Sequence, residues 1–342
     1  MRRVKISGWL AIAAVCSLLL AAGCAPAGKE VTKPAVEPKK QIPKAAAEKA
    51  ATLALKFSPG DSTTYRVITE AGRSIKWEGS LPEEAAFKGG RNLDRTEMTF
   101  AQQIQSIDDK GNAIAKITVK ELKYSSIVKD KPAFEFDSSK PKDPNNPLAK
   151  LIGQSYTIKI APTGEVTEVI DVKEAETAAR KGSTIPTRAL RLLDSEVIKE
   201  RHGTLILPDA GKNQLRTGDR WSSTKTFSFG LMGAESYEKV YTLNEIEDQD
   251  NQQIATIKMN AIPASETPKE QRTTEFLKSF DNTKAYTGQL ELDLTTGKVK
   301  KYLEKLQPEW TIAFPSTEQE PNQEPAVLTM SSARLYSLEK ID

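Results

Sequence analysis

The feature that most constrains this chain is an alternation of apolar and polar residues that recurs along most of its length. Leu290, Leu292 and Leu294 alternate with acidic residues, and similar runs fall at 115–119 and 156–160. This is the period of a β-strand with one buried and one solvated face. Such strands favour antiparallel pairing, because antiparallel sheets commonly leave one face in water. The chain is therefore predicted to be mainly β.

The strand blocks occur twice in the same order. Each copy opens with a Gly-Asp pair, continues with two strands around an acidic turn, and ends in a hairpin that turns at a glycine. The matched residues are Gly60-Asp61 with Gly218-Asp219, Ala115-x-Ile117-x-Val119 with Ala255-x-Ile257-x-Met259, and Gly164 with Gly297. Hairpins resemble one another by chance, but three blocks in one order favour a duplication. We predict repeats at about 53–172 and 205–306.

Each repeat alone would leave a sheet edge and an apolar face in water. Two repeats can bury these faces by sharing them. The predicted fold is therefore mainly β, with antiparallel sheets from two tandem β repeats, arranged as packed curved sheets or as an open barrel. A last alternating run at about 326–339 predicts a C-terminal strand.

A helical period separates the two repeats. Pro186 opens a run in which Leu190 and Leu193 fall on one helical face, and Gly203 ends it. Proline suits the first turn of a helix, and glycine commonly follows the last. We predict one middle helix at about 186–201 that joins or covers the repeats.

The N-terminus has the features of a secretory signal. Basic residues precede an apolar run at 6–20, which is too short for a permanent membrane span. The run leads into Ala21-Ala22-Gly23-Cys24, which resembles the lipobox of bacterial lipoproteins. In that family the cysteine is acylated and becomes the first residue of the mature chain. The resemblance implies a signal peptide at 1–23 and a lipid anchor on Cys24, and an ordinary cleaved signal is the alternative.

The stretch that follows Cys24 is predicted to be a disordered tether over residues 24–52. It is mainly alanine, lysine, proline and glutamate, a composition that cannot bury enough apolar surface to fold. Six lysines and three glutamates at 25–50 place basic charge beside the anchor, where anionic lipid attracts it. The domain at 53–342 has no basic excess, so we predict no nucleic-acid partner. With alanine rather than aspartate after the cysteine, the lipoprotein resemblance implies the outer membrane, on its periplasmic side.

Three motifs mark the domain: K-F-x-x-G-D-x-x-x-Y at 56–65, G-D-x-W at 218–221 after a Leu-Pro pair, and G-Q hairpins that end in G-x-V. This pattern resembles a family of uncharacterised exported bacterial proteins. The resemblance covers residues 53–340 and implies a domain extent without an activity. In location and strand content the chain is also similar to the half-barrel lipid carriers of bacterial envelopes.

The sequence offers few candidates for chemistry. His202 is the only histidine, and no Gly-x-Ser-x-Gly nucleophile motif accompanies it. Its place at the end of the predicted helix favours a contact with the helix C-terminus. Acidic pairs at 108–109 and 247–248 fall in predicted turns, which aspartate stabilises. Cys24 is the only cysteine outside the signal, so we predict no catalytic residue, no metal site and no cofactor.

Aromatic residues gather on two consecutive strands of the second repeat. They are Trp221, Phe227 and Phe229 on one strand and Tyr237 and Tyr241 on the next. A buried core stripe is the simpler interpretation. A ligand groove lined by these side chains is the alternative, since binding pockets are commonly aromatic.

Together these features predict a membrane-anchored, non-enzymatic lipoprotein of the cell envelope that binds a protein partner or an envelope component. The first alternative is a carrier of a lipid or other amphiphile in a cleft between the repeats. The second alternative is a hydrolase that works through carboxylates. A cavity would favour the carrier, a broad exposed apolar patch the partner-binding protein, and two facing acids in a cleft the hydrolase.

Cys24→Ala is expected to remove the anchor. Acyl chains contribute about 0.8 kcal/mol per buried methylene, so two or three chains hold a protein on a membrane where one does not. The variant should lose palmitate labelling and leave the membrane fraction. Cys16→Ala, within the signal, should keep both properties. Unchanged labelling of the Cys24→Ala protein would contradict the lipobox.

Overall fold

The structure is a computed structural model that describes residues 49–79, 89–140, 145–181, 187–203, 206–208, 214–264, 281–314 and 326–341. Residues 47–342 form one compact unit. The predicted signal and Cys24 lie outside the described residues, as does the tether up to residue 48.

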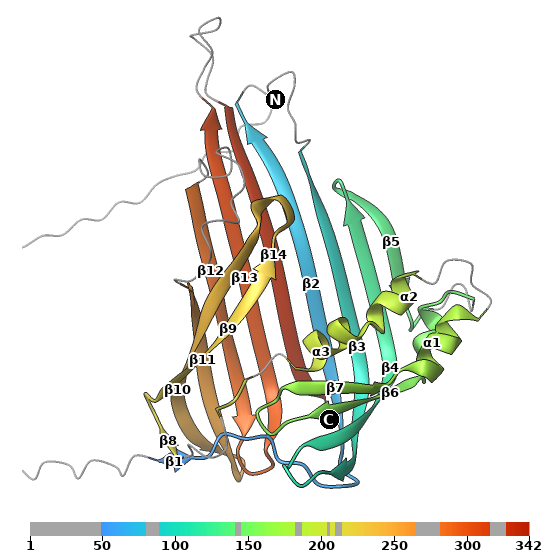
Figure 1. Ribbon diagram of the computed structural model, residues 1–342, viewed down its shortest axis with the longest axis vertical. Coiled ribbons are helices and arrows are strands. Elements are labelled where there is room, and N and C mark those ends of the chain that lie inside the picture. Colours follow the sequence, from blue (N-terminus) through green and yellow to red (C-terminus); the bar gives the residue numbers. More distant parts are fainter. Residues whose placement is uncertain are drawn as a thin grey trace, which may run out of the picture. The chain divides into compact units, whose positions relative to one another are not determined.

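The described residues contain one antiparallel sheet of twelve strands. Its order is β7-β6-β4-β3-β2-β14-β13-β12-β11-β10-β9, with β5 paired to β4 (Figure 1). The strands are β2 Ser62–Glu78, β3 Gly90–Ile107, β4 Ala113–Val128, β5 Lys131–Asp137, β6 Ser155–Ile160, β7 Val166–Asp171, β9 Arg220–Ser228, β10 Ala234–Gln249, β11 Gln252–Pro263, β12 Asp281–Asp293, β13 Lys298–Phe314 and β14 Ala326–Ile341. Burial alternates along most strands, so the mainly β, antiparallel prediction is confirmed.

The residues of the two predicted repeats form two meanders within this sheet. Strands β2, β3, β4, β6 and β7 follow one another as neighbours, and so do β9 to β13. The last strand, β14, pairs with both β13 and β2 and thereby joins the meanders, as the blue and red strands of Figure 1 show. The outer strands β7 and β9 do not pair with each other in the described part of the chain, so the sheet is open.

The openings of the two meanders share the same hydrogen bonds. In the first, the amide of Gly60 donates to the Ile104 carbonyl (2.8 Å), and the Ile104 amide donates to the Asp61 carbonyl (2.8 Å). In the second, Leu243 makes the same two bonds to the Gly218-Asp219 pair (2.8 and 3.0 Å). A register shift follows Ile104 in β3 and Leu243 in β10. These matching details support the Gly-Asp equivalence drawn from sequence.

The predicted match between the second blocks is two residues out of register. Ile104 pairs with Ala115, and its counterpart Leu243 pairs with Ile257. Ala115 therefore corresponds to Ile257 and not to Ala255. A slip of two residues keeps every side chain on the same face, so alternation alone does not detect it.

Two helices, α2 Thr187–Leu192 and α3 Ser195–His202, stand where one was predicted. A further helix, α1 Lys173–Arg180, precedes them and was not predicted. The expected helix breaks at Asp194, whose carboxylate accepts the amides of Glu196 and Val197 (2.9 and 3.3 Å) and so starts a new helix. Two 3₁₀ turns complete the helical elements of the described residues, at Ala149–Leu151 and Gly230–Met232.

The folded unit begins before residue 53, where the tether was predicted to end. Residues Ala50–Ala51 form strand β1, which pairs with β8 at Leu215–Arg216. Residues 53–57 then run between the two equivalent hairpins, where the amide of Leu55 donates to Pro162 O (2.8 Å) and that of Lys56 to Gly297 O (3.1 Å). We call residues 49–57 the strap. Short apolar segments of this kind escape a composition argument, because backbone pairing holds them in place.

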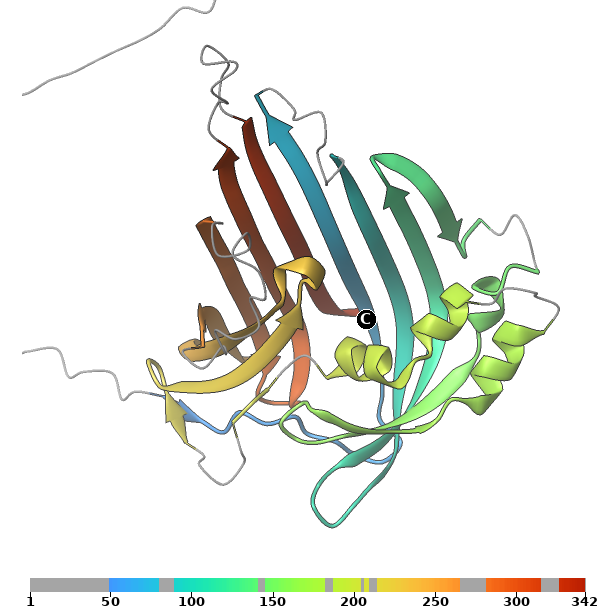
Figure 2. The same cartoon turned by 45° about the horizontal axis from the view of Figure 1, so that its top comes forward.

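The two halves of the sheet cover their concave faces differently (Figure 2). In the second half the sheet curls until β9 lies over β12 and β13, with Phe227 5.6 Å from Tyr286 and Phe229 5.1 Å from Trp310 between ring centroids. In the first half α2 and α3 lie across the sheet, and His202 meets Phe100 of β3 edge-on at 4.6 Å. The curled strands thus cover the concave face of the second half, and α2 and α3 cover the concave face of the first half.

Gly297→Val is expected to destabilise the fold by more than about 2 kcal/mol. Gly297 has φ +65°, and a side chain there would overlap Lys56 of the strap. Gly153→Val is the matched control, because Gly153 also has positive φ (+79°) but open space around it. Urea unfolding should show a larger loss of the free energy of unfolding for Gly297→Val than for Gly153→Val. Equal losses would mean that the strap does not pack against this turn.

Candidate functional site

A cavity of about 610 Å³ opens on the concave face, and we call it the central cavity. Strands β2, β3 and β4 line one side, strands β13, β14 and β9 line the other, and α2 and α3 contribute the remaining wall. The cavity therefore lies over the β2–β14 junction, between the helices of the first half and the curled strands of the second.

Charged side chains form a large part of the wall of this cavity. The basic residues are Arg188, Arg191, Arg201, Lys225 and Arg334, and the acidic residues are Asp94, Glu200 and Glu304. Glu70 reaches the wall from β2, but its side chain alternates to the opposite face, where it pairs with Arg95 at 3.1 Å. Apolar surface comes from side chains such as Leu192, Phe227 and Leu306. The lining is thus amphipathic, with rings and aliphatic chains beside fixed charges.

Two cations cover the aromatic part of the wall. The Lys225 ammonium lies 5.0 Å from the centre of the Phe227 ring, and the Arg334 guanidinium lies 5.1 Å from it. Both also approach the Glu200 carboxylate of α3, at 3.6 and 3.9 Å. Cation–π contacts of this kind are favourable by about 0.5–2 kcal/mol. They link the edge strand β9 to β14 and to α3.

A buried ion pair supports the second half of the sheet. Lys239 of β10 is 1% exposed, and its Nζ lies 2.8 Å from the carboxylate of Glu304 of β13. The hydroxyls of Tyr286 and Tyr302 also donate to Glu304. Because β11 and β12 separate these two strands, the contact requires the sheet to curl back on itself.

Both members of this pair are charged. Burial alone would raise the pKa of Glu304, but Lys239 and the hydrogen bonds outweigh it and hold the pKa below its usual value. Burial would likewise lower the pKa of Lys239, and Glu304 outweighs it and raises the pKa. The charges compensate each other, which is the condition for keeping an ion pair inside a protein.

Arg201 has a different environment. It is 2% exposed, and its Nη2 donates to the Leu192 carbonyl (2.9 Å) and its Nη1 to the Tyr156 hydroxyl (3.4 Å). Among the described residues no carboxylate lies within ion-pair distance of it. The hydroxyl of Tyr336 donates to its backbone carbonyl (2.9 Å) and fixes the end of α3 on β14.

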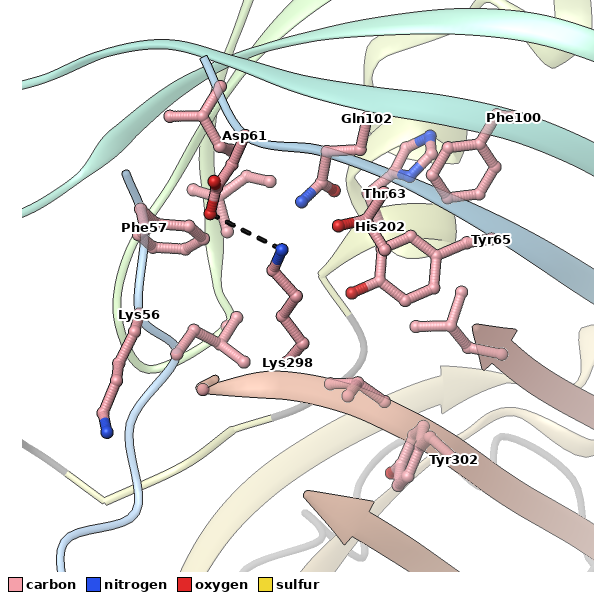
Figure 3. Close-up of a pocket in the computed structure, with 17 residues that line it drawn as sticks. Lys56, Phe57, Asp61, Thr63, Tyr65, Phe100, Gln102, His202, Lys298 and Tyr302 are labelled. Atoms are coloured by element: carbon pink, nitrogen blue, oxygen red, sulfur yellow. Dashed lines mark ion pairs between the residues drawn. The ribbon is translucent and has the colours of Figure 1, made fainter. Parts of the chain in front are cut away.

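A smaller pocket of about 60 Å³ lies beneath the strap (Figure 3). Lys298 reaches into it toward Asp61, at 3.5 Å, and His202 borders it beside Phe100. The His202 Nε2 lies 2.6 Å from the Tyr156 hydroxyl. Burial, with the charge of Arg201 adding to it, lowers the pKa of His202 well below its usual value. His202 is therefore neutral near pH 7, and its Nε2 shares a hydrogen bond with the Tyr156 hydroxyl.

The five aromatic residues singled out from sequence fall in different places. Phe227 lines the central cavity, whereas Tyr237 and Tyr241 are 1% exposed in the core of the curled half. Phe229 is buried there too, against Trp310. Trp221 stacks on Tyr241 at 5.4 Å, and its indole N–H donates to the Ile206 carbonyl. Most of the stripe is core, and one member reaches the cavity.

The sequence analysis did not single out Arg201, Lys239 or Glu304. For two of them a signal exists: Lys239 lies between Tyr237 and Tyr241 in an alternating run, and Glu304 lies likewise between Tyr302 and Leu306. A charge at a core-facing position of each of two strands indicates a buried pair. Arg201 carries no comparable signal, because a basic residue in the last turn of a helix is ordinary.

A family model described as a family of unknown function (DUF6263) matches residues 110–299, more than half of the chain. The chain belongs to this family. No curated protein matches the sequence.

Among solved structures, a lipovitellin chain, described by the words "lipid-protein interactions in lipovitellin", aligns with a TM-score of 0.41 and 10% identity. The alignment covers 84% of this chain and 26% of that chain, so this chain spans about a quarter of its length. A likeness at this level carries no argument about function.

Within the described residues, no group of three or more His, Cys, Asp or Glu side chains is arranged to hold a metal ion. No helix there is both long and apolar enough to cross a membrane.

His202→Gln is expected to remove a pH dependence of stability. Because the pKa of His202 is lower in the folded chain, the unfolded chain takes up the proton first as the pH falls below about 6.5. The wild-type free energy of unfolding should therefore be about 1 kcal/mol smaller at pH 5.5 than at pH 7.5. His202 is the only histidine, so the free energy of unfolding of the variant, measured by urea titration, should differ little between pH 5.5 and pH 7.5. The same dependence in both proteins would contradict a buried neutral ring.

Proposed function

We propose that this chain is a non-enzymatic lipoprotein of the cell envelope that binds an amphiphilic ligand in the central cavity. The observation that carries the proposal is the cavity itself. Its volume of about 610 Å³ falls within the range of about 300–1,000 Å³ that is typical of small-molecule sites. Its wall offers apolar contacts and fixed charges side by side, which suits a ligand with a tail and a polar head.

The proposed anchor would tie the domain that holds this cavity to a lipid surface. Acylation of Cys24 would tie the chain to a membrane, and Ala25 next to it favours the outer membrane and its periplasmic side. The basic residues at 25–50 would add attraction to anionic lipid. An amphiphile in the cavity would then have its source or destination in the adjacent bilayer.

A protein partner was the first choice from sequence alone, and the cavity reverses that order. A docking surface calls for a contiguous apolar patch. The large apolar side chains exposed in the described residues are Ile107, Val128, Ile170, Ile262 and Leu303 on five strands and Ile206 outside any helix or strand. The cavity, in contrast, collects apolar and charged groups at one place.

The carboxylates of the cavity favour a binding role over hydrolysis. Each has a partner: Asp94 with Tyr124, Glu200 with Lys225 and Arg334, and Glu304 with Lys239. A general acid needs a raised pKa, whereas the pKa of Glu304 is lowered. These interactions support a non-enzymatic role over the hydrolase alternative.

Ala71→Trp is expected to abolish ligand binding without unfolding the protein. Ala71 lines the cavity from β2, so an indole there would occupy the ligand's space. Residues 25–342, produced without Cys24, should copurify with an amphiphile seen by native mass spectrometry and organic extraction, and the variant should not.

Ala101→Trp is the matched control. Its neighbours Phe100 and Gln102 line the pocket beneath the strap, so Ala101 lies on the opposite face of β3. This variant should retain the ligand. A wild-type protein that is free of ligand and binds no fluorescent fatty acid would overturn the proposed function.

A further inference from the structure

We infer that Arg201 forms an anion-binding subsite in the central cavity and that the ligand carries a carboxylate or phosphate group. The inference rests on the proposed ligand-binding function and names the chemistry of the ligand's polar end. It begins from a cation that the described protein leaves uncompensated. Burying a charge without a partner is costly, so its retention calls for a counter-charge.

The other basic residues of the wall are accounted for. Lys225 and Arg334 share the Glu200 carboxylate, and Arg188 lies over the Phe134 ring at 4.3 Å. Arg191 is exposed to solvent, where water compensates its charge. Arg201 is only 2% exposed, and within the described residues it is bonded to a carbonyl and a hydroxyl and to no carboxylate.

The guanidinium of Arg201 is held in place before any ligand arrives. The Leu192 carbonyl and the Tyr156 hydroxyl take two of its five N–H groups, and Tyr336 holds its backbone. The remaining N–H groups belong to a side chain that lines the cavity. A planar guanidinium binds carboxylate and phosphate oxygens two at a time, which gives such anions an advantage over neutral groups. Fixing the donor in advance lowers the entropy lost on binding.

Apolar groups elsewhere in the same cavity suit the rest of an amphiphile. Phe227 and Leu306 come from β9 and β13, whereas Arg201 comes from α3. A ligand with its anionic end at α3 would therefore have aliphatic and aromatic contacts for a tail. A small free anion would use the Arg201 end alone, and the experiment below separates the two sources.

The test compares 11-(dansylamino)undecanoic acid with its methyl ester, which differ in the charge of one end. Residues 25–342 without Cys24 are titrated with each probe by fluorescence, and with inorganic phosphate by calorimetry. The acid should bind at least about tenfold more tightly than the ester, because a buried charge-assisted hydrogen bond is lost in the ester. Arg201→Met should bring the two affinities to within about twofold, mainly by weakening the acid.

Arg220→Met is the matched control, since Arg220 is an exposed arginine of β9 that does not line the cavity. It should leave the ratio of the two affinities unchanged. If Arg201→Met fails to fold, the wild-type acid-to-ester ratio still decides, because it needs no mutation. Inorganic phosphate that binds in an Arg201-dependent way, while neither probe binds, would retain the subsite but overturn the amphiphile.

Equal binding of acid and ester would overturn the anion subsite and leave the proposed cavity function standing. An unchanged ratio in a folded Arg201→Met protein would do the same. No binding of either probe or of phosphate would overturn both proposals.

Discussion

The pairing of the first long strand with the last is the constraint on which the rest of the structure depends. β2 and β14 pair over fifteen residues, from Thr64 with Ile341 to Glu78 with Val327. Pairing β2 with β14 closes the whole chain between Glu78 and Ala326 into one loop. Closing so long a loop costs conformational entropy before any contact compensates for it, so the junction depends on both meanders. It turns two five-strand meanders into one sheet with one concave face. The central cavity lies over it, with Ala71 on one side and Tyr336 on the other.

The two halves solve one problem in different ways. Each meander has an apolar face to cover, and each begins with the same Gly-Asp turn and the same register shift. The second half covers its face by curling, which the Lys239–Glu304 pair and the aromatic rings between β9 and β13 stabilise. The first half uses α2 and α3. Because a curled sheet and a pair of short helices do not fill space identically, a gap remains where they meet.

The sequence predicts the strands well because alternation is a local property. It predicts the antiparallel sheet, the C-terminal strand and the Gly-Asp openings. It does not predict which half curls, since curvature depends on contacts such as Lys239 with Glu304 that join strands 65 residues apart. It also misplaces the second block by two residues, because a period of two cannot distinguish such registers.

The functional residues likewise divide into those with a local sequence signal and those whose environment depends on contacts between distant segments. Phe227 was singled out because aromatic residues are visible in a pattern, whereas Arg201 was not, because its burial arises only when α3 meets β14 and β6. The break at Asp194 is a local signal that a capping argument would have found. Cys24 lies outside the described residues, so its acylation stays a prediction from the signal alone.

The charges of the concave face show which half is suited to a ligand. Lys239 and Glu304 neutralise each other, and two tyrosines complete the hydrogen bonds of the carboxylate. Nothing in that set is left for another molecule, so this pair serves the fold. Arg201 is equally buried but has only neutral partners among the described residues. The two buried cations, Lys239 on β10 and Arg201 on α3, thus differ in the presence of a counter-charge within the described residues, and it is the cation without one that borders the open space.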